Sequence, residues 1–177
     1  GWLKEFGKLY KERINLPFSC NVRASSVKED DIIALKEAGL THVWMGVECG
    51  DEKAANEIFL RHTTNETIIK VNNWFKKYGV KVNTFNIMGL PVENAFEVDL
   101  KTLDLNIKLK ANFASFGLLY PFPGTAIAKM SVARGYSAGM NNSVRGIWGA
   151  GKDPSNNRKD EADYVTMASL GNAVDFG

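Results

Sequence analysis

Cysteine and histidine are scarce in this sequence, which has two of each in 177 residues. Cys20 and Cys49 are too few for a disulfide framework, so we expect a reducing, cytoplasmic environment. Neither cysteine has a partner at Cys-x-x-Cys spacing, and His42 and His62 are the only histidines. We therefore expect no zinc or iron–sulfur site built from this chain alone.

An excess of charge of one sign is also absent. The formal net charge is +2, and acidic and basic residues are interleaved along the chain. This balance gives no electrostatic reason to expect binding to nucleic acid or to an anionic membrane surface. No apolar run approaches the length of a membrane span, and the first residues lack the layout of a signal peptide.

What the sequence does have, up to about Ala128, is an alternation of strand-like and helix-like segments. The strand-like segments are "INLPFSCNVR", "THVWMGVE", "VKVNTFNIMGLP" and "NFASFGLLYPFPG". Between them, apolar residues recur at helical spacing. Such repeated βαβ units form a parallel sheet, so the sequence predicts an α/β fold with about four βα units arranged as a partial barrel.

Capping residues support these boundaries. The pattern Ser26–Glu29 is a capping box and predicts a helix that Gly39 ends. Asp51 is predicted to cap the next helix, and Thr64 or Asn65 the one after it.

The composition changes near Met130. The last 47 residues contain seven glycines and five asparagines. We expect residues 1–130 to form the barrel part and residues 131–177 an irregular tail, in which Tyr164, Val165 and Met167 could form one short strand.

Polar residues fall at the predicted carboxyl ends of the strands, where parallel α/β folds bind their ligands. Arg23, Glu48 and Asn86 lie at three such ends. An arginine beside a carboxylate can clamp a zwitterion, the arginine binding its carboxylate and the glutamate its ammonium. Alternatively, Arg23 and Glu48 pair with each other across neighbouring strands.

Cys49 follows Glu48 at this rim, but a catalytic thiol needs a histidine or cation to lower its pKa. His42 lies in the same strand, seven residues before Cys49. We therefore expect Cys49, like Cys20, to be a packing residue.

Taken in order, five segments resemble the catalytic domain of radical S-adenosylmethionine (SAM) enzymes, especially those preceded by a cobalamin-binding domain. They are "INLPFSCNVR", "LKEAGLTHVWMGVECGDE", "IFLRHTTNETI", "YGVKVNTFNIMGLPVEN" and "LNIKLKANFASFGLLYPFPGT". The resemblance covers about residues 1–130.

The resemblance implies a partial (β/α)6 barrel that holds a 4Fe–4S cluster and SAM, and reductive cleavage of SAM to a 5′-deoxyadenosyl radical. Members that use cobalamin often transfer a methyl group. The positions that match the family's SAM-binding pattern are Glu48 and Arg23, facing SAM; Asn86 and Gly89, whose backbone lies near the adenine; and Tyr120 and Pro121, lining the adenine and substrate side.

The sequence departs from the family because it contains no Cys-x3-Cys-x2-Cys motif to hold the cluster. The resemblance begins at the helix before the family's third strand. The expectation is a fragment that does not cleave SAM, with no catalytic or metal-ligating residue of its own. A missing N-terminal half, or another chain, is then expected to cover the open edge of the sheet, and the parent enzyme acts on a small molecule.

The tail resembles one unit of a glycine-rich repeat of phage and marine-virus structural or tail-associated proteins, in "NNSVRGIWGAG" and "DEADYVTMASLGNAVDFG". The junction is expected at residues 128–137, as in a recombined or truncated metagenomic reading frame. Two other functions therefore stay open: a virion-associated structural protein that carries a barrel remnant, and a non-catalytic module that binds a small molecule.

Overall fold

The computed structural model describes residues 2–136, 145–147 and 164–166. The chain divides into two compact units. The first contains Gly1–Asn86 and Leu100–Gly117, and the second contains Ile87–Asp99 and Leu118–Gly177.

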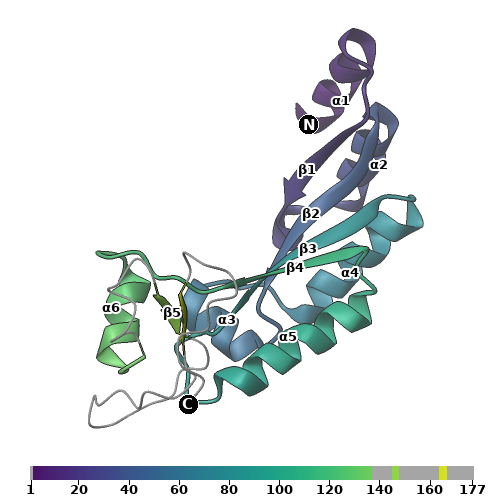
Figure 1. Cartoon of the computed structure of the whole chain (residues 1–177). Coiled ribbons are helices and arrows are strands. Elements are labelled where there is room, and N and C mark those ends of the chain that lie inside the picture. The colour runs from purple at the N-terminus through teal and green to yellow at the C-terminus, as the bar shows by residue number, and fades with distance from the viewer. Residues whose placement is uncertain (1, 137–144, 148–163, 167–177) are drawn as a thin grey trace. The chain divides into compact units, whose positions relative to one another are not determined.

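A four-stranded sheet is built from strands that are neighbours both in the sequence and in space (Figure 1). The strands are β1 (Phe18–Val22), β2 (Leu40–Glu48), β3 (Lys81–Met88) and β4 (Phe113–Leu118), in the order β1-β2-β3-β4. The pairs β1/β2 and β2/β3 are parallel. The predicted α/β class with one parallel sheet is confirmed.

Helices connect the strands of this sheet, as βαβ units require. α2 (Glu29–Ala38) lies between β1 and β2, α3 (Glu52–Phe59) and α4 (Asn65–Lys77) lie between β2 and β3, and α5 (Ala95–Leu109) lies between β3 and β4. α1 (Trp2–Arg13) precedes β1, and α6 (Ala126–Ala133) follows β4. None of the helices in the described ranges is long and apolar enough to cross a membrane.

Most of the predicted helix ends are confirmed. Asp51 accepts a hydrogen bond from Ala54 N at 2.8 Å, and Thr64 Oγ1 accepts one from Thr67 N at 3.2 Å. Gly39 ends α2 with φ +113°, a left-handed conformation that glycine adopts without strain.

The predicted capping box at Ser26–Glu29 is wrong. Residues Ala24–Ser26 form a 3-10 turn, and α2 begins only at Glu29. The box lies two residues later, where Lys28 N donates to Asp31 Oδ2 at 3.3 Å.

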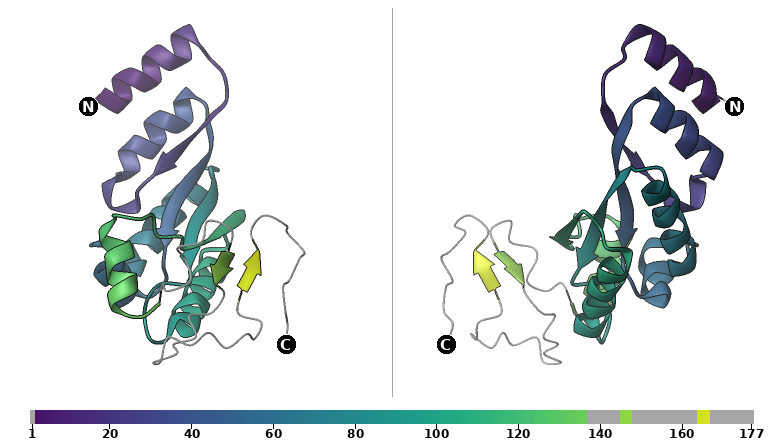
Figure 2. Two further views of the ribbon diagram at one scale, coloured as in Figure 1. Left: turned by 60° about the vertical axis from the view of Figure 1, so that its left-hand side comes forward. Right: turned by 90° about the vertical axis from the view of Figure 1, so that its right-hand side faces the viewer.

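The core lies between one face of the sheet and the helices. Along β2, Val43, Met45 and Val47 are buried. They belong to one apolar cluster with residues of α2, α4 and α5, namely Ile32, Leu35, Ile68, Val71, Phe75, Leu105 and Leu109. Figure 2 shows these helices beside the sheet.

The opposite face of the sheet carries aromatic side chains instead. Trp44 stacks on Phe85 with ring centroids 4.7 Å apart and meets Phe113 edge-on at 5.8 Å. Phe85 is 39% exposed and Phe113 is 57% exposed. This face, which is called the open face below, therefore carries partly exposed aromatic surface.

In the second unit, α6 is followed by β5 (Arg145–Ile147), which pairs antiparallel with β6 (Tyr164–Thr166). The strand β6 lies where the sequence predicted a short strand. Most of residues 131–177 lie outside the described residues, so the virus-like repeat and the separate tail domain stay predictions. The predicted boundary at residue 130 falls within α6.

Candidate functional site

The exit of β2 has an unusual backbone at Glu48. The β2/β3 register shifts there, since Gly46 is the partner of Phe85 whereas Glu48 is the partner of Asn86. Glu48 has φ +65°, and Cys49 N donates to Val47 O at 2.8 Å across it. These features describe a γ-turn centred on a non-glycine residue, a strained conformation that is often found at functional sites.

The Glu48 carboxylate is held by Arg61, which lies between α3 and α4. Arg61 Nη2 donates to Glu48 Oε1 at 2.8 Å, and Arg61 Nη1 donates to Gly46 O at 2.8 Å. The side chains of Arg61 and Glu48 are 24% and 17% exposed. Glu48 therefore pairs with Arg61, and the alternative pairing with Arg23 is wrong.

Gly46 makes room for this ion pair. A Cβ atom at Gly46 would lie 2.7 Å from Glu48 Oε1 and 3.2 Å from both terminal nitrogens of Arg61. Side chains alternate along a strand, so a Cβ at position 46 would point, like Trp44, to the open face. The ion pair thus covers the carboxyl end of β2 on the open face.

Burial raises the pKa of Glu48 above its ordinary value, and the charge of Arg61 opposes this shift in part. Asp51, three residues on, shows the opposite behaviour. A hydrogen bond from Lys101, at 2.6 Å, and one from Ala54 N lower the pKa of Asp51. Two carboxylates in one strand exit thus have pKa values shifted in opposite directions, as is common in functional sites.

The raised pKa of Glu48 predicts a pH-dependent loss of stability. A carboxyl whose folded-state pKa exceeds its unfolded value stabilises the fold while it is protonated, and this stability is lost as pH rises through the folded pKa. In Glu48→Gln this loss should be absent, so the variant should gain stability relative to the wild type from about pH 4 upward. Urea unfolding of both proteins between pH 4 and pH 8 measures the difference, and a difference that does not change with pH would contradict the prediction.

Beyond Glu48, the chain turns directly onto α5. Gly50 N donates to Thr102 Oγ1 at 2.8 Å, and Gly50 O accepts from Asn65 Nδ2 at 2.8 Å. A Cβ at Gly50 would lie 2.7 Å from Thr102 Cα and would overlap the carbonyl group of Lys101. Only glycine allows this close approach of strand exit and helix.

Asn86 lies beside Glu48, but its side chain is buried on the helix-facing side. Its Nδ2 donates to Ser115 O at 3.0 Å and to Thr84 Oγ1 at 3.1 Å, and its Oδ1 accepts from Asn106 Nδ2 at 2.7 Å. The amide is satisfied within the protein and the residue is 3% exposed, so the side chain of Asn86 is not available to a ligand.

Arg23 follows β1 and is exposed. The register of β1 and β2 ends with Val22 opposite Met45, so Arg23 lies next to the level of Gly46. Among the described residues its guanidinium has no hydrogen-bond or ion-pair partner. The structure thus brings Arg23, Glu48 and Asn86 to the same end of neighbouring strands.

The other three predicted residues, Gly89, Tyr120 and Pro121, belong to the second unit. Gly89 has φ +71°, and its N–H donates to Asp99 Oδ1 at 3.1 Å and Oδ2 at 3.2 Å. Burial raises the pKa of Asp99, and the hydrogen bond from Gly89 opposes this. Tyr120 meets Phe122 edge-on, with centroids 5.9 Å apart, and Pro121 is buried.

The two cysteines behave as packing residues in the described structure. Cys49 is 2% exposed, and its Sγ–H donates to Asp51 O at 3.5 Å. Cys20 is half-buried, and burial raises the pKa of its thiol. In the described ranges no group of three or more His, Cys, Asp or Glu residues could hold a metal ion. These residues therefore do not fit a 4Fe–4S cluster.

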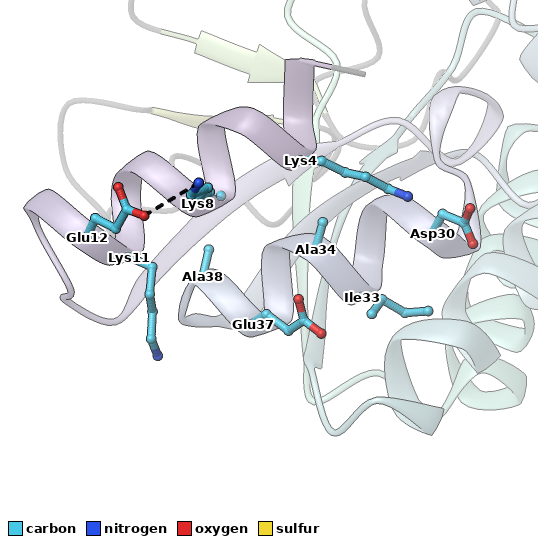
Figure 3. A pocket seen from close by; sticks show the side chains of 10 residues that line it. Lys4, Lys8, Lys11, Glu12, Asp30, Ile33, Ala34, Glu37 and Ala38 are labelled. Carbon is cyan, nitrogen blue, oxygen red and sulfur yellow. Dashed lines mark ion pairs between the residues drawn. The ribbon is translucent and has the colours of Figure 1, made fainter.

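A groove of about 540 Å³ lies between α1 and α2 and is separate from this rim (Figure 3). Lysines and acidic residues both line it, and the pair Lys8–Glu12 across 3.9 Å is largely exposed. Such exposed pairs contribute little, and none of the predicted site residues lines the groove.

Sequence reasoning missed Arg61, Thr102 and Asn106. Arg61 stands in the segment "IFLRHTTNETI", which carried part of the resemblance, but its partner Glu48 is 13 residues away. No periodicity predicts such a contact.

Residues 3–102 match the radical SAM superfamily. This is more than half of the chain, and the chain therefore belongs to the radical SAM superfamily.

An uncharacterized methyltransferase of Pyrococcus horikoshii is 26% identical over 134 residues, which are 76% of this chain and 29% of that protein. The radical SAM methyltransferase TsrM of Kitasatospora setae, solved with cobalamin and a [4Fe-4S] cluster bound, has a TM-score of 0.61 and 16% identity over 81% of this chain and 30% of TsrM. TsrM with its tryptophan substrate and the SAM analogue aza-SAM has a TM-score of 0.63, 18% identity, and coverage of 77% and 28%. The chain thus spans less than a third of the length of these relatives.

Proposed function

We propose that the exit of β2 binds the amino-acid part of SAM, with Glu48 and Arg61 as a clamp for its two charges. The observation that carries the proposal is the strained Glu48 turn, whose carboxylate is held through one oxygen only. Among the described residues, Glu48 Oε2 has no hydrogen-bond partner, and Arg61 uses two of its five N–H donors.

These free groups suit a zwitterion. An ammonium group can donate to Glu48 Oε2, and a carboxylate can accept from the remaining N–H groups of Arg61. Arg23, exposed at the neighbouring strand end, adds a second cation beside the same rim. From the family resemblance, the backbone of Asn86 and Gly89 is proposed to lie near the adenine, and Tyr120 and Pro121 are proposed to line the adenine and substrate side.

In the family, the 4Fe–4S cluster supplies the electron that cleaves SAM. The described residues of this chain do not fit that cluster, and we propose that its thiolates come from another part of the whole enzyme or from another chain. We therefore propose that this chain contributes part of the SAM pocket and does not cleave SAM by itself. Methyl transfer with cobalamin is proposed for the whole enzyme from its similarity to TsrM and to the Pyrococcus methyltransferase.

The whole enzyme also needs a cover for the sheet. The strands β1 and β4 are its two edges, and Phe85 and Phe113 expose aromatic surface on the open face. Unpaired edges and exposed apolar surface are sites of association. The proposed partner is the part of the barrel that precedes the match, on the same chain or on another.

Calorimetric titration of the chain with SAM tests the proposal. We expect measurable binding by the wild type and at least tenfold weaker binding by Glu48→Gln, because the amide cannot balance the ammonium charge. Glu37→Gln, an exposed change on α2, is the control and should bind like the wild type. Equal affinities of the wild type and Glu48→Gln would exclude the clamp.

A further inference from the structure

The exits of β2 and β3 are tied to α5 by buried side chains that do not reach the rim surface. Thr102 is fully buried and accepts the hydrogen bond from Gly50 N. One helical turn later, Asn106 is 5% exposed, and its Nδ2 donates to Thr102 O at 2.8 Å and to Asn86 Oδ1 at 2.7 Å. Asn106 Oδ1 also accepts from Thr84 Oγ1.

These bonds hold the two backbone segments that set the position of Glu48. On one side, Gly50 lies two residues beyond Glu48 and is fixed on α5. On the other side, Asn86 is the cross-strand partner of Glu48, at the point where the register shifts. The strained turn at Glu48 therefore lies between two fixed points, and surrounding structure of this kind is what maintains a strained conformation.

We propose that Thr102 and Asn106 are positioning residues for the Glu48–Arg61 clamp. Their hydrogen bonds described above go to Gly50, Thr84 and Asn86, and they act by holding the exits of β2 and β3 at the spacing in which Glu48 lies over Gly46. The inference rests on the proposed function only for its effect on SAM binding. Its effect on Glu48 itself is independent of any ligand.

The test compares Thr102→Val with Thr102→Ser in the full chain. Valine keeps the shape of threonine but cannot accept the bond from Gly50 N, whereas serine can. We expect Thr102→Val to bind SAM about tenfold more weakly, because the buried hydrogen bond from Gly50 N is lost, and Thr102→Ser to bind like the wild type. The second readout is the pH titration of the Glu48 carboxyl carbon by ¹³C NMR. In Thr102→Val the pKa of Glu48 should move back toward its ordinary value.

A general loss of stability would not move the titration of a carboxyl group in the folded state. Thr102→Val with a lower melting temperature but unchanged Glu48 titration and unchanged SAM affinity would overturn the inference. If the wild type does not bind SAM, the proposed function fails, and the Glu48 titration alone still decides the positioning role. If Thr102→Val does not fold, Asn106→Asp, which keeps the size but removes two donors, is judged by the same two readouts.

Discussion

Replacing Gly50 with alanine is expected to destabilise the first unit by about 3 kcal/mol, the upper range for inserting atoms into a packed site. The new Cβ would lie 2.7 Å from Thr102 Cα and overlap the carbonyl group of Lys101, and both obstacles are backbone atoms of α5 that cannot rotate away. The helix or the strand exit must then shift, and the Gly50–Thr102 hydrogen bond is lost. Urea unfolding followed by circular dichroism measures the change.

Gly117→Ala is the matched control for Gly50→Ala. The nearest atom to a Cβ at Gly117 would be Asn86 O, at 4.0 Å, an ordinary contact. This variant should stay within about 0.5 kcal/mol of the wild type. A Gly50→Ala protein as stable as Gly117→Ala would mean that α5 does not pack on the exit of β2 as described.

The parts of the fold that could be predicted from the sequence are those that neighbouring residues determine. The stop at Gly39 needs only a residue that tolerates φ +113°, and the cap at Asp51 bonds an N–H three residues away. Along β2 the buried residues Val43, Met45 and Val47 recur at every second position, although Trp44 between them is also apolar, so the alternation marks the buried face only in part. Ser26 is misleading because its own backbone closes a 3-10 turn, which is equally local but competes with the capping box.

The candidate site is predictable only in part. Glu48 can be found because a carboxylate at a strand exit is conspicuous. The strand pattern also places Asn86 correctly near the carboxyl end of β3. A position at a strand end does not by itself show which face of the sheet the Asn86 side chain lies on. Val82, Thr84 and Asn86 have the same parity along β3, and all three are buried on the face that packs against α5. That parity is visible in the sequence and assigns Asn86 to the helix-facing side.

The rest depends on contacts between distant segments. Thr102 meets Gly50 across 52 residues, and Asn106 meets Asn86 across 20. In the helical pattern of α5, both appear simply as polar residues on an apolar face. Such positions signal a buried polar network, because a polar group inside a core must be hydrogen-bonded. The signal identifies the residue but not its partner, which only the packing of strand exits on α5 supplies.

Arg61→Leu is expected to have the largest effect on ligand binding, reducing affinity for SAM about 100-fold, since it removes the proposed carboxylate donors and leaves Glu48 unpaired. The half-buried carboxylate then loses the cation that opposes the effect of burial, so the pKa of Glu48 should rise further. At pH 7 the free energy of unfolding should fall by about 2 kcal/mol, because an unpaired charge in a half-buried site is costly.

Arg61→Lys keeps the positive charge, but lysine cannot bond Gly46 O and Glu48 Oε1 with one planar fork. The affinity of Arg61→Lys for SAM should therefore lie between those of the wild type and Arg61→Leu. Arg13→Leu, an exposed change at the end of α1, serves as the control for loss of a positive charge. Calorimetry with SAM measures the affinity, and urea unfolding measures the stability, of the wild type and the three variants. A loss of stability in Arg61→Leu without any loss of SAM affinity would leave the ion pair a purely structural role.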